Sequence, residues 1–418
     1  MREIHIRGEN PLYGTIHIHG AKNSVLPMLA ATILHPGISV IQGCPRLSDV
    51  ETASAILRFL GADLIWEQDA LIVNASSLNA AEIPEHLMRE MRSSVIFLGA
   101  MLARFGEAQL SYPGGCELGP RPIDLHLYAL SQLGATFAEH GGTLHAQAKK
   151  LTGASIHLAT PSVGATENAM LAAVGAEGIT EIHNAAREPE IEDLQCFLNA
   201  LGAEVSGAGT STVTVSGGRA THDARHRVMP DRIVAATYLA ALAAAGGEAE
   251  LIGAEESRLR SVIASFREMG ARLCETETGL LISRREVLKA PRSIRTAPYP
   301  GFPTDAQAIL MAAALKAQGT SIFAENIFES RYRHVDELIR MGADIRTEGR
   351  VAIVRGVPRL RGASLRCTDL RGGAALVVAA LAAAGESRIS AIEHIDRGYE
   401  DISRDLRLLG ADICTADF

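Results

Sequence analysis

Apolar stretches that predict helices alternate with β-rich runs along the whole chain, and the alternation is periodic. A triplet of one apolar residue, glycine and alanine recurs, with its glycine at Gly61, Gly134, Gly202, Gly270, Gly342 and Gly410. Successive glycines are 73, 68, 68, 72 and 68 residues apart. Such even spacing indicates an internal repeat of about 70 residues, present six times.

Each repeat shows the same order of patterns. An almost continuous apolar stretch, such as ENAMLAAVGAEG, predicts a buried helix that stops at a glycine. These stops are Gly37, Gly106, Gly178, Gly247, Gly319 and Gly385. A β-rich run and a polar loop follow, then a second helix that ends at the apolar-Gly-Ala triplet, and a short hairpin. The pattern predicts an α/β fold of β-α-β-α-β-β units.

The units can be grouped in several ways. A ring, a solenoid and two groups of three all fit the pattern, and domain-size limits favour two compact domains of three units. Residues 216–231 (SGGRATHDARHRVMPD), near the midpoint, are rich in glycine, histidine and arginine, which favours a linker there. Equivalent positions of the units are expected to gather at one end of the structure.

Composition and charge narrow the possible functions. The 418 residues are 47% hydrophobic and 21% charged, as in ordinary globular proteins. A formal net charge of −8 without a long basic run disfavours nucleic acid as the main partner. The chain has six cysteines and no Cys-x-x-Cys pair, which fits a reducing compartment. With no apolar signal-peptide core and no run long enough to span a bilayer, we expect a cytoplasmic protein without membrane insertion.

Polar residues recur at the predicted start of each buried helix. They are Lys22-Asn23, Arg92-Ser93, Ser162-Val163-Gly164, Asp231-Arg232, Thr304-Asp305, and Asp369 with Arg371. A helix N-cap explains the three aspartates as well as a functional role does. It does not explain Lys22, Arg92 and Arg371, because a cation is unfavourable at the positive end of a helix dipole. These cations indicate an anionic ligand near the helix N-termini.

A second set of polar residues follows the β-rich runs. It comprises Arg46, Cys116 with Arg121, Arg187-Glu188, Arg331 and Arg397. A solvated surface arginine is the better explanation for any single one, whereas a set related by repeat symmetry favours a common site. Two facing domains would enclose a cleft lined by Lys22, Arg92, Arg121, Arg331, Arg371 and Arg397. Such a cleft suits a small, multiply charged anion.

Motifs for common cofactors are absent from the sequence. It contains no GxxxxGK[ST] loop, no GxGxxG after a strand, no GxSxG elbow and no HExxH. His222 and His226 are four residues apart but have no third ligand nearby in the sequence. We therefore expect neither a metal nor a cofactor.

Ten segments, in a fixed order over residues 22–399, carry a family resemblance. They are GAKNSVLPMLAA, MRSSVIFLG, YPGGCELGPRPIDLH, SVGATENAMLAA, NAAREPEIED, MPDRI, GFPTDAQA, ESRYRHVDEL, TDLRGGAALVVAAL and EHIDRGYEDI. Together they resemble the UDP-N-acetylglucosamine enolpyruvyl transferases of the EPSP synthase superfamily. The sister family, 5-enolpyruvylshikimate-3-phosphate synthase, shares the six-unit architecture but lacks the Gly-Gly-Cys loop and the HIDRGYE segment.

The resemblance implies an inside-out α/β barrel of two domains, each with three pseudo-threefold repeats. Residues 22–229 are expected to form one domain, which carries a lid loop with Cys116. Residues 1–21 and 230–418 are expected to form the other, with the active site in the cleft between them. We expect a monomer, and an oligomer stays open as the alternative.

The implied reaction moves the enolpyruvyl group of phosphoenolpyruvate to the 3-hydroxyl of UDP-N-acetylglucosamine and releases phosphate. It proceeds by addition and elimination, and it is the first committed step of peptidoglycan precursor synthesis. By motif match, the catalytic residues are Cys116 as proton donor, Asp305 as acceptor of the hydroxyl proton, Lys22 and Arg397.

The resemblance also assigns binding residues. The expected ligands of phosphoenolpyruvate are Lys22, Asn23, Cys116, Arg121 and Arg397. The sugar nucleotide is expected to contact Asn23, Arg92, Arg121, Pro122, Ile123, Asp124, Leu125, Ser162, Val163, Gly164, Asp305 and Ile327. Residues expected to shape the cleft and its closure are Glu188, Asp231, Arg331, Asp369 and Arg371.

Cys116 lies in the loop-like stretch SYPGGCELGPRP, residues 111–122. Neighbouring cations lower the pKa of a thiol, so a value near the working pH would allow both proton donation and alkylation. The resemblance implies sensitivity to fosfomycin and a covalent phosphoenolpyruvate adduct at this sulfur, with residues 111–121 as a mobile lid. Two alternatives remain: the sister reaction on shikimate 3-phosphate, and a catalytically silent paralogue that binds the sugar nucleotide.

Overall fold

The computed structural model of the chain describes residues 2–111 and 123–417. These residues divide into two compact units, each with its own hydrophobic core. The N-terminal unit contains residues 20–111 and 123–229, and the C-terminal unit joins residues 2–19 to residues 230–417. Within the described residues, no helix is long and apolar enough to cross a membrane.

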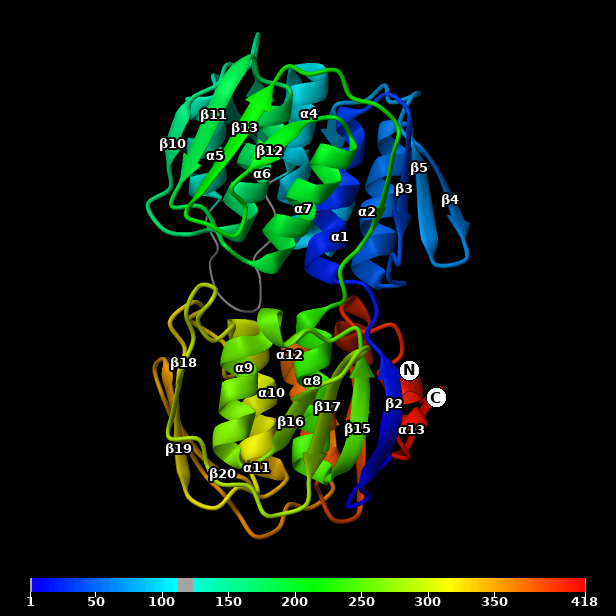
Figure 1. Ribbon diagram of the computed structural model, residues 1–418, viewed down its shortest axis with the longest axis vertical. Coiled ribbons are helices and arrows are strands. Elements are labelled where there is room, and N and C mark those ends of the chain that lie inside the picture. Colours follow the sequence, from blue (N-terminus) through cyan, green and yellow to red (C-terminus); the bar gives the residue numbers. More distant parts are fainter. Residues whose placement is uncertain (1, 112–122, 418) are drawn as a thin grey trace. The chain divides into compact units, whose positions relative to one another are not determined.

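The described part of each unit contains three copies of one supersecondary arrangement (Figure 1). One copy consists of β18 (Ser293–Arg295), α10 (Thr304–Ala314), β19 (Thr320–Ala324), α11 (Val335–Arg340), β20 (Asp344–Glu348) and β21 (Val351–Arg355). Strands β18 and β19 are parallel, and the β20–β21 hairpin adds to β19 in antiparallel pairing. The order of elements is the β-α-β-α-β-β order predicted from the sequence.

The sheets of the N-terminal unit have the orders β14-β3-β5-β4, β6-β7-β9-β8 and β10-β11-β13-β12. Their strands are β3 (Ile38–Gln42), β4 (Asp63–Glu67), β5 (Ala70–Asn74), β6 (Glu82–Ile83), β7 (Glu107–Ser111), β8 (Thr136–His140), β9 (Thr143–Gln147), β10 (Ser155–His157), β11 (Gly178–His183), β12 (Glu204–Ser206), β13 (Thr212–Gly217) and β14 (Ala224–Arg227). Each sheet repeats the parallel pair followed by the antiparallel hairpin.

The C-terminal unit adds the sheets β16-β17-β15-β2 and β22-β23-β1-β24 to the sheet of β18. Their strands are β1 (Arg2–Arg7), β2 (Leu12–His17), β15 (Gly247–Ile252), β16 (Arg272–Glu275), β17 (Gly279–Arg284), β22 (Ser364–Arg366), β23 (Glu386–Ser390) and β24 (Asp412–Asp417). The first two strands of the chain therefore complete sheets of this unit.

Pairing between strands far apart in the sequence changes the interpretation of residues 216–231. The sequence predicts a linker there, but residues 224–227 form β14, which pairs in parallel with β3 of the first repeat. The linker prediction is therefore wrong for this strand. The chain passes between the units twice, and backbone bonds join the two passages. Ala21 N donates to Met229 O (2.7 Å), and Asp231 N donates to His19 O (2.8 Å).

The apolar stretches form central helices. They are α1 (Lys22–Ala31), α4 (Phe97–Phe105), α6 (Val163–Val174), α8 (Arg232–Ala245), α10 and α12 (Leu370–Leu381). A helix that is apolar on all sides is stable only when it is buried on all sides. Small residues allow close packing: a Cβ added to Gly99 of α4 would lie 2.3 Å from Asn168 O of α6.

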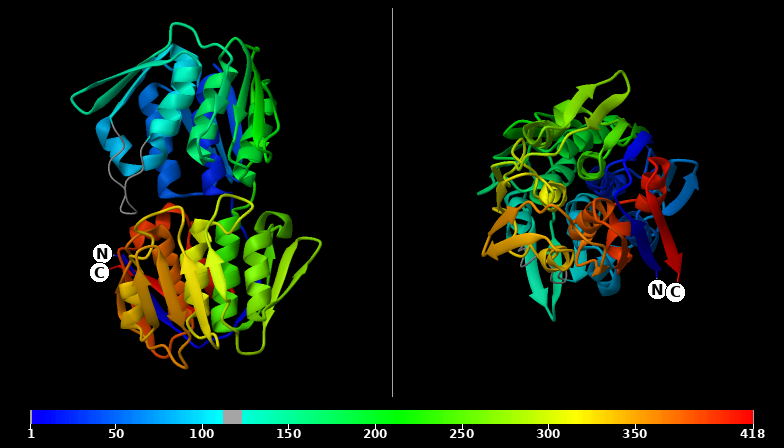
Figure 2. Two further views of the ribbon diagram at one scale, coloured as in Figure 1. Left: turned by 90° about the vertical axis from the view of Figure 1, so that its left-hand side faces the viewer. Right: turned by 90° about the horizontal axis from the view of Figure 1, so that it is seen from below.

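Outer helices and sheets surround the central helices in each unit (Figures 1 and 2). The outer helices are α2 (Ser48–Leu60), α5 (Asp124–Gln132), α7 (Pro189–Ala200), α9 (Glu256–Met269), α11 and α13 (Ile402–Leu408). With helices inside and sheets outside, each unit has the inside-out α/β arrangement expected from the sequence.

The two sets of repeated glycines have different roles. The glycines of the apolar-Gly-Ala triplet follow the outer helices, and their φ angles lie between 91° and 105°. This left-handed conformation favours glycine, as predicted. Among the predicted stops of the buried helices, Gly106 caps α4 directly. Gly319 and Gly385 instead lie several residues beyond α10 and α12, where the next strand begins, so their predicted capping role is wrong.

Candidate active site

Charged side chains gather where the central helices of the C-terminal unit begin. Asp231 precedes α8, Asp305 lies in the first turn of α10, and Asp369 precedes α12. Arg371, in the first turn of α12, and Arg331, from the segment after β19, join them. We call these five residues the Asp–Arg cluster. The structure thus brings together the residues that the sequence predicts at equivalent repeat positions of this unit.

Asp305 is held by two arginines. Arg331 Nη2 donates to Asp305 Oδ1 (2.8 Å), and Arg371 Nη2 donates to Asp305 Oδ2 (3.2 Å). Only 2% of Arg331 and 3% of Arg371 is exposed, so both cations are removed from bulk water. Arg331 Nη2 also donates to Thr304 O (3.0 Å), which fixes it against the first turn of α10. Buried cations need such anionic partners.

The aspartates at the other two helix starts act as N-caps. Asp231 Oδ1 accepts hydrogen bonds from Ile233 N (2.8 Å) and Val234 N (3.1 Å). Asp369 Oδ1 accepts from Arg371 N and Gly372 N at 3.1 and 3.0 Å. The capping interpretation therefore holds for these two aspartates. It is wrong for Asp305, because Pro303 occupies the N-cap position of α10 and Asp305 pairs with the arginines instead.

Burial and neighbouring charges shift the pKa values of this cluster. Burial would lower the pKa of Arg371, but the charge of Asp305, with Tyr399 and Asp231, raises it above the ordinary arginine value. Burial would raise the pKa of Asp369, but Arg331 and the hydrogen bond from Gly372 N lower it overall. Asp369 and Arg371 are therefore both charged at neutral pH.

Two further buried side chains support the Asp–Arg cluster. The Tyr399 hydroxyl lies 2.6 Å from Thr237 Oγ1 of α8, and Tyr399 also interacts with Arg371. His334 is fully buried, and burial lowers its pKa to about 4 despite the nearby charge of Asp369. His334 is therefore neutral at physiological pH.

In the N-terminal unit, Lys22 is the first residue of α1. Its Nζ lies 2.6 Å from Asp49 Oδ2 of α2, and both residues are buried. The next residue, Asn23, is partly buried, and Arg92 begins the short 3-10 helix η2 (Arg92–Ile96). Lys22 thus places an amino group at the first turn of α1, a position that can bind an anion.

The start of α6 lies against α5. Ser162 is the N-cap, and its hydroxyl accepts a hydrogen bond from Ala165 N (3.4 Å). A Cβ added to Gly164 would lie 2.8 Å from the ring of His126, so a larger residue would not fit here. Val163 begins α6, Asp124 and Leu125 begin α5, and Ile123 directly precedes α5. These two helix starts therefore bring the predicted uridine-nucleotide segments together.

Asn168 connects the elements around these helix starts. Its amide nitrogen lies within 2.8 Å of His126 Nδ1 and 2.9 Å of Val95 O, and its Oδ1 accepts from Gly99 N at 2.7 Å. Sequence reasoning missed Asn168, because its spacing within α6 is that of any helical residue. Its polar side chain, next to those of Thr166 and Glu167 in a mostly apolar stretch, is the only signal in the sequence.

Two buried glutamates, Glu167 and Glu190, and the partly buried Glu188 lie near the start of α7. Glu188 occupies the N-cap position of α7, without a side-chain cap, and Glu190 lies in the first turn. Burial, together with the charges of Glu190 and Glu188, raises the pKa of Glu167 of α6 well above its ordinary value. The structure thus places Glu188 beside α6, one of the central helices.

The loop arginines have different environments. Arg331 is buried, and Arg397 is partly buried at the end of the 3-10 helix η3 (Ile392–Arg397). Arg46 is exposed and stacks over Trp66, 3.6 Å from the ring centre, and Arg187 is also exposed. The surface-arginine alternative therefore fits Arg46 and Arg187 and is wrong for Arg331.

Some predicted site residues fall outside the described residues. They are Cys116, Arg121 and Pro122. The expected lid of residues 111–121 also lies there, apart from Ser111, which ends β7. What the sequence implies for this segment therefore stays a prediction.

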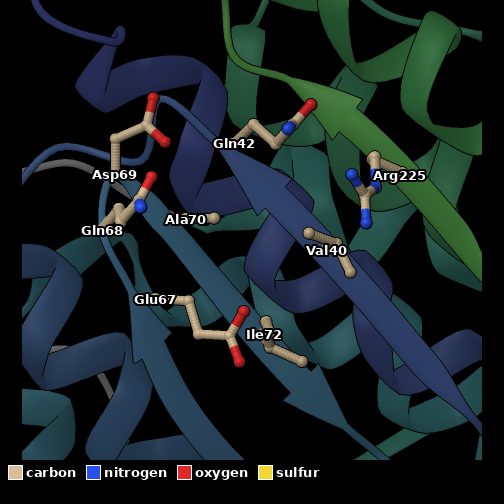
Figure 3. Close-up of a pocket in the computed structure, with 8 residues that line it drawn as sticks. All are labelled: Val40, Gln42, Glu67, Gln68, Asp69, Ala70, Ile72 and Arg225. Atoms are coloured by element: carbon tan, nitrogen blue, oxygen red, sulfur yellow. The ribbon is translucent and has the colours of Figure 1, made fainter.

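An open hollow of about 510 Å³ lies elsewhere, over the sheet β14-β3-β5-β4 (Figure 3). Its lining consists of Val40, Gln42, Glu67, Gln68, Asp69, Ala70, Ile72 and Arg225. None of these residues is a site residue predicted from the sequence. Because the lining mixes charges of both signs on an open sheet surface, it does not define a ligand.

Known proteins share the sequence pattern and the fold of this chain. Residues 6–406 match the EPSP synthase (3-phosphoshikimate 1-carboxyvinyltransferase) family. The chain is 48% identical to UDP-N-acetylglucosamine 1-carboxyvinyltransferase 2 of Caldanaerobacter subterraneus subsp. tengcongensis, over 99% of both chains. It is 46% identical to UDP-N-acetylglucosamine 1-carboxyvinyltransferase 1 of Carboxydothermus hydrogenoformans, over 99% of this chain and 98% of that protein. The chain therefore belongs to the EPSP synthase family, and within it to the UDP-N-acetylglucosamine 1-carboxyvinyltransferases.

Solved structures of the family share the fold. The enolpyruvyl transferase NikO from Streptomyces tendae superposes with a TM-score of 0.88 at 26% identity, over 99% of this chain and 98% of that one. EPSP synthase from Acinetobacter baumannii superposes over the full length of both chains with a TM-score of 0.76 at 19% identity, which shows the fold alone. The expected α/β fold of repeated units is therefore confirmed.

Proposed function

We propose that this chain transfers the enolpyruvyl group of phosphoenolpyruvate to the 3-hydroxyl of UDP-N-acetylglucosamine and releases phosphate. The single observation that carries this proposal is its identity of 45–48% over almost the full length to relatives named for the activity. The reaction begins the synthesis of peptidoglycan precursors.

The Asp–Arg cluster has the chemistry that such a substrate needs. Phosphoenolpyruvate carries a phosphate and a carboxylate, and guanidinium groups bind both with paired hydrogen bonds. The buried nitrogens Arg331 Nε and Arg371 Nη1 have no hydrogen-bond partner among the described residues. Donors that are buried without a partner cost free energy until a ligand accepts from them. They support a role of this cluster in binding an anion or closing around it.

The proposed chemistry moves two protons in the addition step. The thiol of Cys116 gives its proton to the methylene carbon of phosphoenolpyruvate, while the sugar 3-oxygen bonds to the central carbon. Asp305 takes the proton of the 3-hydroxyl. In the elimination, the thiolate of Cys116 takes a proton back from the same methyl carbon, the bond between the central carbon and the phosphate oxygen breaks, and phosphate departs with the proton held by Asp305. Placed donors and acceptors of this kind contribute about 10²–10⁴-fold to the rate.

The remaining roles follow the family match. Phosphoenolpyruvate is bound by Lys22, Asn23, Cys116, Arg121 and Arg397. The sugar nucleotide is bound by Asn23, Arg92, Arg121, Pro122, Ile123, Asp124, Leu125, Ser162, Val163, Gly164, Asp305 and Ile327. Because these residues come from both units, the proposal places the site in a cleft between domains of residues 22–229 and of residues 1–21 with 230–418. The residues shaping that cleft are Glu188, Asp231, Arg331, Asp369 and Arg371.

We also propose that the enzyme works in the cytoplasm. Cys44, Cys196, Cys274, Cys367 and Cys414 are free thiols, which are stable in a reducing compartment. Phosphoenolpyruvate and UDP-N-acetylglucosamine are both charged, so they do not cross a bilayer unaided.

The assay that tests this function follows phosphate release with phosphoenolpyruvate and either of two acceptors. We expect turnover with UDP-N-acetylglucosamine and none with shikimate 3-phosphate. Turnover with shikimate 3-phosphate alone would instead support the sister reaction. Release with neither acceptor, despite binding of the sugar nucleotide, would support a catalytically silent paralogue.

The same assay tests the proton donor. Cys116→Ala should lose nearly all turnover, because no other acid is proposed for the methylene carbon. Cys116→Asp should keep part of it, because a carboxylic acid can also donate a proton. Full activity of the alanine variant would contradict the assignment.

A further inference from the structure

Glu325 is a fully buried carboxylate directly after β19, at the start of the segment that leads to Arg331. Its Oε1 accepts from Ile327 N (2.8 Å) and Phe328 N (3.0 Å). The same oxygen accepts from the hydroxyl of Thr296 (2.9 Å). A buried carboxylate needs this many donors, because each bond offsets part of its lost hydration.

The other oxygen of Glu325 reaches the start of α10. Thr304 Oγ1 donates to Glu325 Oε2 (2.9 Å), and Thr304 is the residue directly before Asp305. The backbone carbonyl of Thr304 accepts from Arg331 Nη2 (3.0 Å), the same nitrogen that pairs with Asp305. Thr304 is therefore held by Glu325 through its side chain and by Arg331 through its backbone.

We propose that Glu325 is a positioning residue for the transfer reaction. One carboxylate oxygen fixes the segment that carries Ile327 and leads to Arg331. The other oxygen fixes the turn that carries Asp305. Glu325 thereby sets the distance between the group that takes the hydroxyl proton and the segment that contacts the sugar nucleotide. This inference rests on the proposed function, and it adds a residue that the sequence did not single out.

Comparison of the repeats argues against a purely structural role. The residue at the equivalent position is Gly43, Asn184, Gly253 or Ala391 in four other repeats, and each of these has a positive φ, between 55° and 86°. The turn after the strand is made there by a backbone of positive φ, and in one repeat the side-chain amide of Asn184 also donates to Leu158 O (2.8 Å). The φ angle of Glu325 is not positive, and its side chain connects the turn to Thr296 and Thr304 instead. The fold can form this turn without a buried carboxylate.

The first test changes only the contact to α10. Thr304→Val removes the hydroxyl and keeps the branched shape, whereas Thr304→Ser keeps the hydroxyl. We expect Thr304→Val to lower kcat about tenfold, because small misplacements of a reacting group can cost up to about 10²-fold. Both KM values should change less than about twofold, since the residues proposed to bind substrate are intact. Thr304→Ser should restore most of the rate.

A pH profile separates positioning from general loosening of the fold. Without the Thr304 hydroxyl, Asp305 is less firmly held against Arg331, so the acidic limb of kcat should move to higher pH in Thr304→Val. A merely structural role would lower the melting temperature without moving that limb. Ser321→Ala is the matched control, because it removes a buried hydroxyl of β19 that has no partner among the described residues. This control should leave kcat, both KM values and the pH profile unchanged.

The second test changes Glu325 itself. The amide of Glu325→Gln keeps an acceptor for Ile327 N and can donate to Thr304 Oγ1, so its effect should be smaller than that of Glu325→Ala. Glu325→Ala should lower kcat about 10²-fold and raise KM for UDP-N-acetylglucosamine several-fold, because it releases both segments. If Glu325→Ala does not fold, the Thr304 pair still decides the question.

The outcomes are distinguishable from failure of the proposed function. If the unchanged protein releases no phosphate with UDP-N-acetylglucosamine, the function is wrong and the positioning role falls with it. If the unchanged protein is active and Thr304→Val equals Thr304→Ser in kcat and pH profile, the function stands and the role of Glu325 is overturned. Loss of stability with normal kcat in Glu325→Ala would also overturn it.

Discussion

Asp305 illustrates how the environment of one carboxylate restricts its chemistry. Its two oxygens pair with Arg331 and Arg371, which are almost completely buried. Cations this close stabilise the negative charge of the carboxylate and fix the position of both oxygens. Under the proposed function, this carboxylate takes the proton of the sugar 3-hydroxyl while the two arginines hold it in place.

His334 gives a prediction on stability and pH. Burial lowers its pKa to about 4, whereas an unfolded histidine titrates near 6.5. Between these values the unfolded chain binds the extra proton and the folded chain does not, so stability falls as pH falls through this window. The shift corresponds to about 3 kcal/mol. The free energy of unfolding of His334→Gln should therefore lose about 3 kcal/mol less than that of the unchanged protein between pH 7.5 and 4.

Urea unfolding at several pH values measures this difference. His86→Gln, which changes an exposed histidine of α3 (Glu85–Glu90), is the matched control and should keep the slope of the unchanged protein. Equal slopes for His334→Gln and the unchanged protein would contradict the assignment of a neutral buried imidazole.

At the scale of elements, the strand after each central helix has one small buried position. In the register of the repeats this position is occupied by Ser39, Ala108, Thr180, Ala249, Ser321 and Ser387. The hydroxyls at this position have no hydrogen-bond partner among the described residues. Alanine in two of the repeats indicates that the fold does not need the hydroxyl.

Ser387→Ala should therefore raise the free energy of unfolding by about 1 kcal/mol, because it removes a buried polar group without a partner. Ser390→Ala, on the same strand β23, should lower it by a similar amount, since the hydroxyl of Ser390 donates to Leu365 O (3.1 Å). Thermal unfolding of both variants checks this. A destabilised Ser387→Ala would show that its hydroxyl is bonded after all.

Periodic elements were predictable from the sequence, and elements that depend on distant partners were not. The triplet glycines Gly61 and Gly410 end outer helices with left-handed backbones, as their local pattern indicates. The sequence predicts a linker at strand β14, because the four residues of this strand gain their stability from β3, far away in the sequence. Local pattern contains no information on such pairing.

The residues of the candidate site follow the same rule: those at periodic positions were predictable, and their partners from distant segments were not. Helix-start positions such as Lys22 and Asp305 could be identified, because N-termini and charges recur with the repeat. Asp49, the partner of Lys22, and Glu325, the partner of Thr304 beside Asp305, could not be identified, because only the packing of separate elements brings these carboxylates there. Tertiary contacts of this kind leave no periodic signal in the chain.

At the scale of the whole molecule, the described residues of the N-terminal unit are inserted between two segments of the C-terminal unit. The chain leaves at residue 19 and returns at residue 230, and backbone bonds join the two passages. Strand β14 completes the first sheet of the N-terminal unit from within that unit. A polypeptide of residues 20–229 should therefore fold by itself and unfold cooperatively.

Thermal unfolding followed by circular dichroism tests this expectation. The C-terminal counterpart, residues 230–418 without residues 1–19, should not fold cooperatively, because it lacks β1 and β2 from its sheets. A cooperative transition in that truncated chain, or none in residues 20–229, would contradict the described division of strands.

The proposed activity depends on the site residues, the helices that position them and both units, and identification of the product tests it most directly. The protein is incubated with phosphoenolpyruvate and UDP-N-acetylglucosamine, and the nucleotide is analysed by mass spectrometry and NMR. We predict a UDP-N-acetylglucosamine that carries a carboxyvinyl group on its 3-oxygen, formed in equal amount to the phosphate released. Recovery of unchanged UDP-N-acetylglucosamine, or formation of pyruvate and phosphate alone, would contradict the proposed function.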